Sequence, residues 1–237
     1  MSEHSNLFIK RLEAGETVIG IAGLGYVGLP LAQHFVKAGL RVVAVDTDPG
    51  KIARLRRGES YLLHLSAEWV PDAIEQKIFF PTTDYEGLVG ADAVIICVPT
   101  PLNPHREPDL CHVESAGREI ARILKPGALV SLESTTYPGT TTEVLLPLLS
   151  EKGARAGEDF FLAFSPERED PGNPRFSVSN IPKVIGGVTP ECAELARRLY
   201  SRIFYKTVVV SCPEAAELCK LLENIFRSVN IALVNEL

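Results

Sequence analysis

The chain has 237 residues, 46% of them hydrophobic, so it is long enough to bury an α/β core as one large domain with an appendage. Its formal net charge of −6 argues against a surface that binds nucleic acid or an anionic membrane. The sequence has no apolar run near the roughly 18 residues that a membrane helix needs and no signal-peptide core at its start, so we expect a cytoplasmic location.

The five cysteines include no C-x-x-C pair, and the five histidines are scattered along the chain. This pattern indicates neither a disulfide framework nor a zinc site. We therefore predict reduced thiols and no bound metal.

The first predicted elements are those of a dinucleotide-binding βαβ unit. An apolar strand is expected at residues 17–22, a helix at 26–38 and a second strand at 41–45. The first strand and the helix are joined by Gly-Leu-Gly-Tyr-Val-Gly, which has the spacing G-x-G-x-x-G. Glycines with this spacing, after a strand and before a helix, are typical of a site for a dinucleotide pyrophosphate.

Each glycine of that pattern has a physical reason. Gly23 makes the tight turn, Gly25 admits the pyrophosphate because it has no Cβ, and Gly28 lets the helix pack on the strand. Asp46 follows the second strand, where its carboxylate would accept hydrogen bonds from ribose hydroxyls and repel a 2′-phosphate. We therefore predict NAD, rather than NADP, as the cofactor.

Further apolar runs predict the rest of an α/β, doubly wound, mainly parallel sheet of the Rossmann type. The runs do not alternate with polar residues, so the strands are expected to be covered on both faces. Ligands bind beyond the carboxyl ends of such strands, which directs attention to the loops after Val98, Leu132 and Phe164. The six further predicted strands are residues 78–81, 93–98, 128–132, 160–164, 183–186 and 207–210.

Hydroxyl and acidic residues follow these strands. Thr100 lies in the first loop and Thr135 in the second, while Thr140 or Thr141 is expected to cap a helix at 142–149. Glu167 opens a third loop, in which three acids and an arginine occupy four positions. Such a cluster is commonly a solvated turn, but its position at a strand's carboxyl end favours the active edge. Residues 102–110, rich in proline and charge, predict an exposed loop.

The chain ends in a predicted long helix, residues 213–237, which would extend about 35 Å. Its apolar residues cover more than one stripe, so the sheet domain cannot bury them all, and we expect a homodimer through this helix. Glu217, Lys220 and Asn224 share one helical face. From spacing alone, the simplest interpretation of the first two is a surface ion pair worth a few tenths of a kcal/mol.

Taken together, these motifs resemble the nucleotide-sugar 6-dehydrogenase family, the UDP-glucose/GDP-mannose dehydrogenases, over residues 17–237. Two segments, residues 133–141 and 165–173, look most like the branch that oxidises UDP-N-acetylglucosamine. The resemblance rests on the glycine loop with Leu29-Pro30, Asp46 with Lys51, Val98-Pro-Thr-Pro101, Ser134-Thr135 with Pro138-Gly-Thr, Ser165-Pro-Glu167, Ala216-Glu217-x-x-Lys220-x-x-x-Asn224 and Asn235-Glu-Leu237.

The resemblance implies oxidation of a sugar C6 alcohol to a carboxylate by two NAD molecules, through a thiohemiacetal and a thioester on a cysteine. It implies that Glu167 is the acid/base for thioester hydrolysis and that Lys220 and Asn224 stabilise the oxyanion at C6. Thr135 would order the catalytic water. The implied cofactor-binding residues are Gly23, Gly25, Tyr26, Val27, Gly28, Asp46, Lys51, Thr100 and Thr135.

Two departures from the family pattern limit this interpretation. Many relatives have a second glutamate where this chain has Pro171, so any role of that glutamate must be absent or moved to Glu169 or Asp170. None of the cysteines lies in the family's nucleophile motif. We therefore expect residues 1–212 to be the NAD-binding domain and 213–237 the start of a connecting helix, with the nucleotide-sugar domain absent. We also expect that this chain cannot complete the oxidation.

Two alternatives stay open from the sequence. One is a 3-hydroxyacid dehydrogenase of the 6-phosphogluconate type, against which the loop at Glu167 argues. The other is a non-catalytic module for NAD binding or dimerisation, in which the absence of a nucleophilic cysteine is natural.

Overall fold

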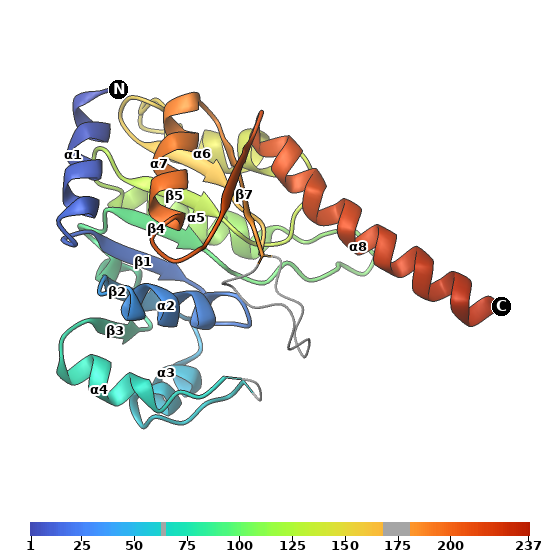
Figure 1. Ribbon diagram of the computed structural model, residues 1–237, viewed down its shortest axis with the longest axis horizontal. Helices are drawn as coiled ribbons and strands as arrows, with labels where there is room; N and C mark the ends of the chain where they lie inside the picture. Colours follow the sequence, from blue (N-terminus) through green and yellow to red (C-terminus); the bar gives the residue numbers. More distant parts are fainter. Residues whose placement is uncertain (63–64, 168–180) are drawn as a thin grey trace.

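A sheet of eight strands forms the centre of the protein in the computed structural model, which describes residues 1–62, 65–167 and 181–237 (Figure 1). All eight predicted strands are confirmed, with ends that differ from the prediction by at most two residues. The strands are β1 (Val18–Ala22), β2 (Arg41–Val45), β3 (Phe79–Thr82), β4 (Ala93–Ile96), β5 (Leu129–Leu132), β6 (Phe161–Phe164), β7 (Lys183–Gly187) and β8 (Thr207–Val210).

The strand order is β3-β2-β1-β4-β5-β6-β7-β8, and every neighbouring pair is parallel except β6 and β7. The chain builds outward from β1 to β3, then crosses back and builds outward in the other direction from β4. The loops after β1 and β4 therefore diverge at the point where ligands bind in doubly wound sheets. The predicted Rossmann-type architecture is confirmed.

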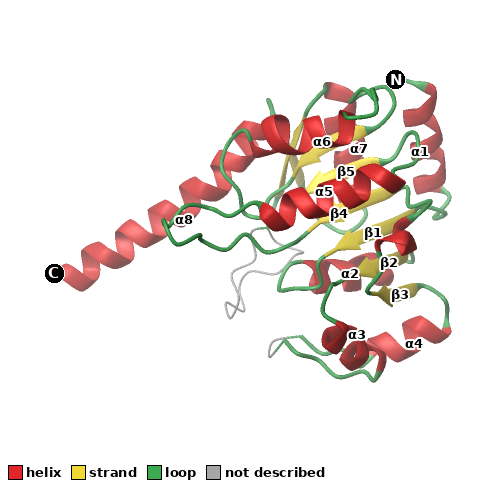
Figure 2. Ribbon diagram, turned by 180° about the vertical axis from the view of Figure 1, so that it is seen from behind, coloured by secondary structure: helices red, strands yellow, loops and turns green. Residues whose placement is uncertain are grey.

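Helices cover both faces of the sheet, as the continuous apolar strands predicted. Two buried apolar clusters, one on each face, combine residues of the strands with residues of the helices that cover them. One face carries α1 (Glu3–Glu13), α2 (Gly28–Lys37) and α7 (Pro190–Tyr200), and Figure 2 shows α5 (Cys111–Ile123) and α6 (Leu146–Ser150) on the other. The remaining short elements are α3 (Pro49–Arg56), α4 (Trp69–Glu75), η1 (Tyr85–Leu88) and η2 (Thr140–Leu145).

Helix α1 is not among the predicted elements. Ser2 caps its first turn, and Arg11 near its end donates to Asp92 at 2.9 Å, just before β4. Lys125 lies 2.5 Å from the same carboxylate, and the Val18 N–H donates to it at 2.8 Å. Burial alone would raise the pKa of Asp92, but these three partners outweigh burial and lower it. The ion cluster fastens α1 to the amino ends of the strands, away from the predicted site.

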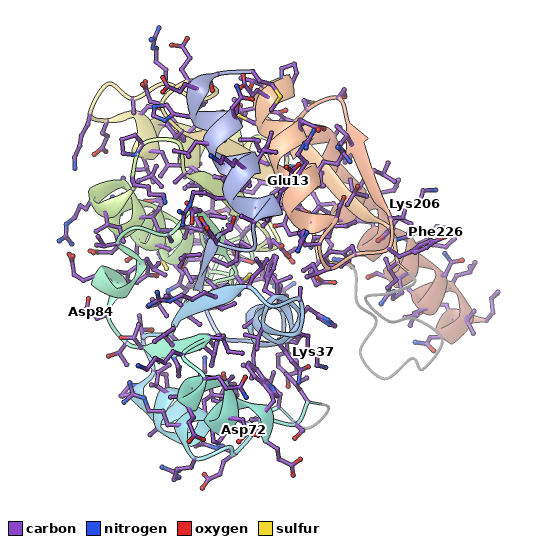
Figure 3. The ribbon with its side chains drawn as sticks, turned by 60° about the vertical axis from the view of Figure 1, so that its left-hand side comes forward. Glu13, Lys37, Asp72, Asp84, Lys206 and Phe226 are labelled. Atoms are coloured by element: carbon purple, nitrogen blue, oxygen red, sulfur yellow. The ribbon has the colours of Figure 1, made fainter. Side chains whose placement is uncertain are left out.

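The last helix, α8 (Pro213–Glu236), contacts the domain mainly through its first turns and then projects from it (Figure 1). Pro213, Ala216 and Glu217 are buried, whereas Phe226, labelled in Figure 3, is 70% exposed. The large exposed apolar residues of this helix are Leu218, Leu222, Ile225, Phe226, Val229, Ile231, Leu233 and Val234. Among the described residues, no helix combines the length and apolar character needed to cross a membrane.

Candidate functional site

The site is built at the carboxyl edge of the parallel strands, where the loops after β1, β4, β5 and β6 meet. Gly23 directly extends β1, because its N–H donates to the Val45 carbonyl at 2.7 Å. Gly23 has φ +96°, and a Cβ there would lie 2.6 Å from the Cys97 carbonyl oxygen. A Cβ on Gly28 would lie 1.8 Å from the Gly23 carbonyl oxygen. Both positions therefore exclude a side chain through contacts within the protein.

Gly25 differs from these two glycines. Among the described residues, no atom lies within 4 Å of the position that its Cβ would take, and its φ is outside the left-handed range. Neither packing against the described part of the chain nor backbone conformation requires glycine there. The open space fits an external group that approaches the backbone closely, as a pyrophosphate does in this motif.

The amino end of α2 lies beside this space. Its first residue is Gly28, and its N-cap residue Val27 makes no side-chain capping bond. The first N–H groups of a helix lack partners within the helix and carry partial positive charge, which favours an anion. Tyr26 is 64% exposed at the tip of the loop. The loop and helix together fit the cofactor's pyrophosphate.

Asp46 directly follows β2 and is buried beside the glycine loop. Its Oδ2 accepts a hydrogen bond from the Leu24 N–H at 2.9 Å and lies 2.8 Å from Lys51 Nζ. Its Oδ1 accepts from the Asp48 N–H at 3.0 Å. A carboxylate and a lysine each have further hydrogen-bonding capacity. The pair borders a cleft of about 200 Å³ that is also lined by Gly23, Thr47, Tyr85, Val98, Pro99, His112 and Ser115.

The loops after β4 and β5 are tied together. The Thr100 hydroxyl donates to the Thr135 carbonyl at 2.6 Å, and the Ser134 hydroxyl donates to the Val98 carbonyl at 2.7 Å. Thr135 itself is exposed, while Thr136 is buried with no hydrogen-bond partner for its hydroxyl among the described residues. The two threonines singled out from the sequence therefore lie side by side at the edge of the sheet.

The predicted cap of the next helix is wrong. That helix begins at Thr140, earlier than predicted, and its N-terminus is capped by a residue from α8. Glu217 Oε2 accepts from the Gly139 N–H at 2.7 Å, and Oε1 accepts from the Thr141 N–H at 2.9 Å and the Thr141 hydroxyl at 2.7 Å. A carboxylate at this position satisfies the free N–H groups of the helix end.

The interpretation of Glu217 as half of a surface ion pair is wrong for the same reason. Glu217 is fully buried, and burial raises its pKa, although its bonds to Thr141 and Gly139 oppose that rise. The residue joins α8 to the loop after β5. It thereby fixes the direction in which the rest of the helix leaves the domain.

Lys220, one turn further along α8, lies against the loop after β6. Its Nζ donates to the backbone carbonyl of Glu167. Burial lowers the pKa of Lys220, while the charges of Glu167 and Glu223 oppose the change. Asn224 lies another turn along and is exposed. The structure thus brings Lys220 to Glu167, and Asn224 lies on the same helix as Lys220. Arg168, Glu169, Asp170 and Pro171 lie outside the described residues.

Three polar residues beneath Glu167 are absent from the sequence-based set. Lys183 Nζ lies 2.7 Å from Glu133 Oε2 and 3.5 Å from Glu167 Oε2, and the Tyr200 hydroxyl donates to Glu133 Oε1 at 2.6 Å. Burial alone would lower the pKa of Lys183, but the two carboxylates raise it. The one signal in the sequence is a lysine that opens an otherwise apolar strand.

The described part of the chain contains no group of three or more His, Cys, Asp or Glu residues that is placed to hold a metal ion. The site as described therefore consists of a phosphate-binding loop, a carboxylate–lysine pair and a cluster of threonine, glutamate and lysine side chains.

The chain is similar to known proteins over most of its length. The model of the UDP-glucose/GDP-mannose dehydrogenase family, NAD binding domain, matches residues 17–204. The chain is 43% identical over 221 residues to the UDP-N-acetyl-D-glucosamine 6-dehydrogenase of Pseudomonas aeruginosa, covering 92% of this chain and 51% of that protein. It is 40% identical over 229 residues to the UDP-N-acetyl-D-mannosamine dehydrogenase of Escherichia coli K12, covering 92% and 53%.

Solved structures of dehydrogenases match the fold of this chain. The structure of a UDP-D-ManNAc dehydrogenase from Pyrococcus horikoshii matches with a TM-score of 0.87 at 37% identity, covering 93% of this chain and 53% of that one. A ternary complex of GDP-mannose dehydrogenase from Pseudomonas aeruginosa matches with a TM-score of 0.83 at 27% identity, covering 92% and 51%. The chain spans about half the length of the relatives that it matches.

Proposed function

Because the chain belongs to the UDP-glucose/GDP-mannose dehydrogenase family and contains that family's NAD-binding domain, we propose that the full-length protein oxidises the C6 alcohol of a UDP-sugar to a carboxylate. The favoured substrate is UDP-N-acetylglucosamine, which appears in the name of the Pseudomonas aeruginosa relative. The observation that carries the proposal is the contact of Lys220 on α8 with the Glu167 loop, at the edge that also holds the glycine loop.

The geometry of the loops supports a set of roles in cofactor binding. Gly25 and the start of α2, with Tyr26 and Val27, would hold the pyrophosphate. Asp46 and Lys51, 2.8 Å apart, would bind the adenosine ribose. Thr100 and Thr135 would lie on the nicotinamide side. When bound, NAD supplies the acceptor for the hydride that leaves C6.

The catalytic roles belong to the cluster around Glu167. Glu167 would act as the acid/base in the hydrolytic half of the reaction, with Thr135 ordering the water. Lys220 and Asn224 would stabilise negative charge on the C6 oxygen. Lys220 suits this role because its lowered pKa makes its proton easier to share with an oxyanion.

The proposal also covers the organisation of the chain. Residues 1–212 form the cofactor domain, and 213–237 begin a helix that connects it to a nucleotide-sugar domain in the full-length protein. The exposed apolar residues of α8 would then be covered by that domain and by a second copy of the helix.

We expect this chain to form a twofold dimer through α8, because Ile225 and Val229 are 56% and 59% exposed on a projecting helix. Light scattering at micromolar concentration should give twice the monomer mass, and Ile225→Glu or Val229→Glu should shift the protein to monomer. The matched control is Lys37→Glu, a charge change on the exposed end of α2. A monomeric parent would contradict the dimer, and a dimer insensitive to both α8 charges would show that its interface lies elsewhere.

The substrate proposal needs the full-length protein, which sequencing of the gene around codon 237 would define. We expect incubation with NAD and UDP-N-acetylglucosamine to give two NADH per uronic acid formed, and UDP-N-acetylmannosamine to react more slowly. Faster oxidation of the mannosamine sugar would reassign the substrate. A full-length protein that produced no NADH with either sugar would overturn the proposed oxidation.

A further inference from the structure

A buried charged cluster lies beneath the Ser165-Pro-Glu167 segment, and the proposed reaction gives its members no direct part. Lys183, the first residue of β7, and Glu133, directly after β5, are 2% and 0% exposed at their side chains. Lys183 Nζ is 2.7 Å from Glu133 Oε2, 3.3 Å from the Pro166 carbonyl and 3.5 Å from Glu167 Oε2. Each of the three N–H donors of the ammonium therefore has an acceptor.

Aromatic residues of α7 and the segment after it hold Glu133 and the Lys183 ammonium in place. The Tyr200 hydroxyl donates to Glu133 Oε1 at 2.6 Å and lies 2.8 Å from the Ser131 hydroxyl. Lys183 Nζ lies 5.1 Å from the centre of the Tyr200 ring and 5.0 Å from that of Phe204. Both Glu133 oxygens are thus occupied, and the lysine has aromatic faces behind it.

The direction of β7 explains why this lysine reaches the site. β7 runs antiparallel to β6, with Phe164 opposite Gly186. Continuing that register places Lys183 opposite Glu167, so the amino end of β7 lies at the same edge as the carboxyl end of β6. The Ser165 hydroxyl donates to the Val184 carbonyl at 2.8 Å, which supports this alignment.

We propose that Lys183 is a positioning residue for Glu167, whose carboxylate and preceding backbone it holds at the active edge while Glu133 and Tyr200 hold the lysine. Stability is a weak explanation for such a cluster, because a buried ion pair is often no more stabilising than well-packed apolar residues. The contact of Lys183 with the Glu167 carboxylate, whose side chain is 15% exposed, instead links the cluster to the site. The inference rests on the proposed function, in which Glu167 is the acid/base.

The test measures the pH at which Glu167 takes up a proton, by NMR of side-chain ¹³C-labelled glutamate, with the resonance assigned from Glu167→Gln. A positive charge within hydrogen-bonding range favours the ionised carboxylate, so Lys183→Met should raise the titration midpoint by about one pH unit or more. Among the described residues, the charged or titratable groups that interact with Glu167 include His34 on α2, Cys97 after β4, Glu133 after β5, Lys183 on β7 and Lys220 on α8.

The matched control is Lys206→Met, which removes the same charge from an exposed side chain just before β8 (Figure 3). In the Lys206→Met variant, the titration midpoint of Glu167 should equal that of the parent protein. A folded Lys183→Met variant with an unchanged midpoint would overturn the proposal, because a purely structural lysine would not set the protonation of Glu167.

Lys183→Met leaves Glu133 buried without its cation and can therefore fail to fold. The double variant Lys183→Met with Glu133→Gln removes both charges and should still raise the midpoint, but by less than the single variant, because it also removes a carboxylate that repels the ionised Glu167. The reciprocal measurement needs neither variant: Glu167→Gln should move the ¹³Cε resonance of Lys183, and an unmoved resonance would contradict the contact. None of these titrations uses cofactor or substrate, so a full-length protein that failed to oxidise nucleotide sugars would overturn the proposed function and leave this contact standing.

Discussion

Lys220→Ala is expected to lower kcat of the full-length protein by about 10²–10³-fold with UDP-N-acetylglucosamine, because it removes a preorganised donor from the oxyanion that develops at C6. KM for NAD should stay near that of the parent, since Lys220 lies on α8 and Asp46 and the glycine loop lie after other strands. Steady-state measurement of NADH formation gives both values.

The control for that variant is Lys206→Ala, which removes an exposed lysine from the same domain. It should leave kcat unchanged. A Lys220→Ala protein that keeps parental kcat would show that the lysine only supports the Glu167 backbone, which it also contacts.

Alanine at two positions of the glycine loop should separate folding from cofactor binding. Gly28→Ala should destabilise the domain by about 3 kcal/mol or more, because its Cβ would overlap the Gly23 carbonyl oxygen at 1.8 Å and the backbone must move. Gly25→Ala should leave the unfolding free energy near the parental value, since no atom of the residues that the structure describes lies within 4 Å of the new Cβ. It should weaken NADH binding about 10- to 100-fold, or roughly 1.4–2.8 kcal/mol.

Urea unfolding measures the first effect and calorimetric titration of NADH the second. The two variants are controls for each other, because each adds one methyl group to the same loop. If Gly25→Ala bound NADH as tightly as the parent, the open space at Gly25 would not be the place of the pyrophosphate.

Much of the fold follows from local sequence signals. Continuous apolar runs such as Ala93–Ile96 and Leu129–Leu132 identify strands covered on both faces, and the glycine spacing with Asp46 identifies the βαβ unit. These signals are local because the residues that produce each of them lie within one strand or within one βαβ segment of the chain. The loops after those strands could be singled out because parallel strands bring their carboxyl ends to one edge.

What the sequence did not reveal depends on residues far apart in the chain. Glu217 looks like a surface residue of a helix, yet it is buried because the 139–141 loop presents free N–H groups to it. Lys183 begins a strand whose antiparallel direction no local pattern indicates, so attention to carboxyl ends alone missed it. Both errors come from tertiary contacts, with separations of 76 and 50 residues between Glu217 and Thr141 and between Lys183 and Glu133.

The buried carboxylate after β2 is expected to make this site selective for NAD, and calorimetric titration of the chain with NADH and with NADPH tests that selectivity directly. We predict clearly tighter binding of NADH, because Asp46 would accept the ribose hydroxyls and repel a 2′-phosphate. Asp46→Ala should weaken NADH binding by about 1–3 kcal/mol through loss of a charged acceptor. If the parent bound NADPH as tightly as NADH or more tightly, that result would contradict the role of Asp46 and the NAD selectivity of the site.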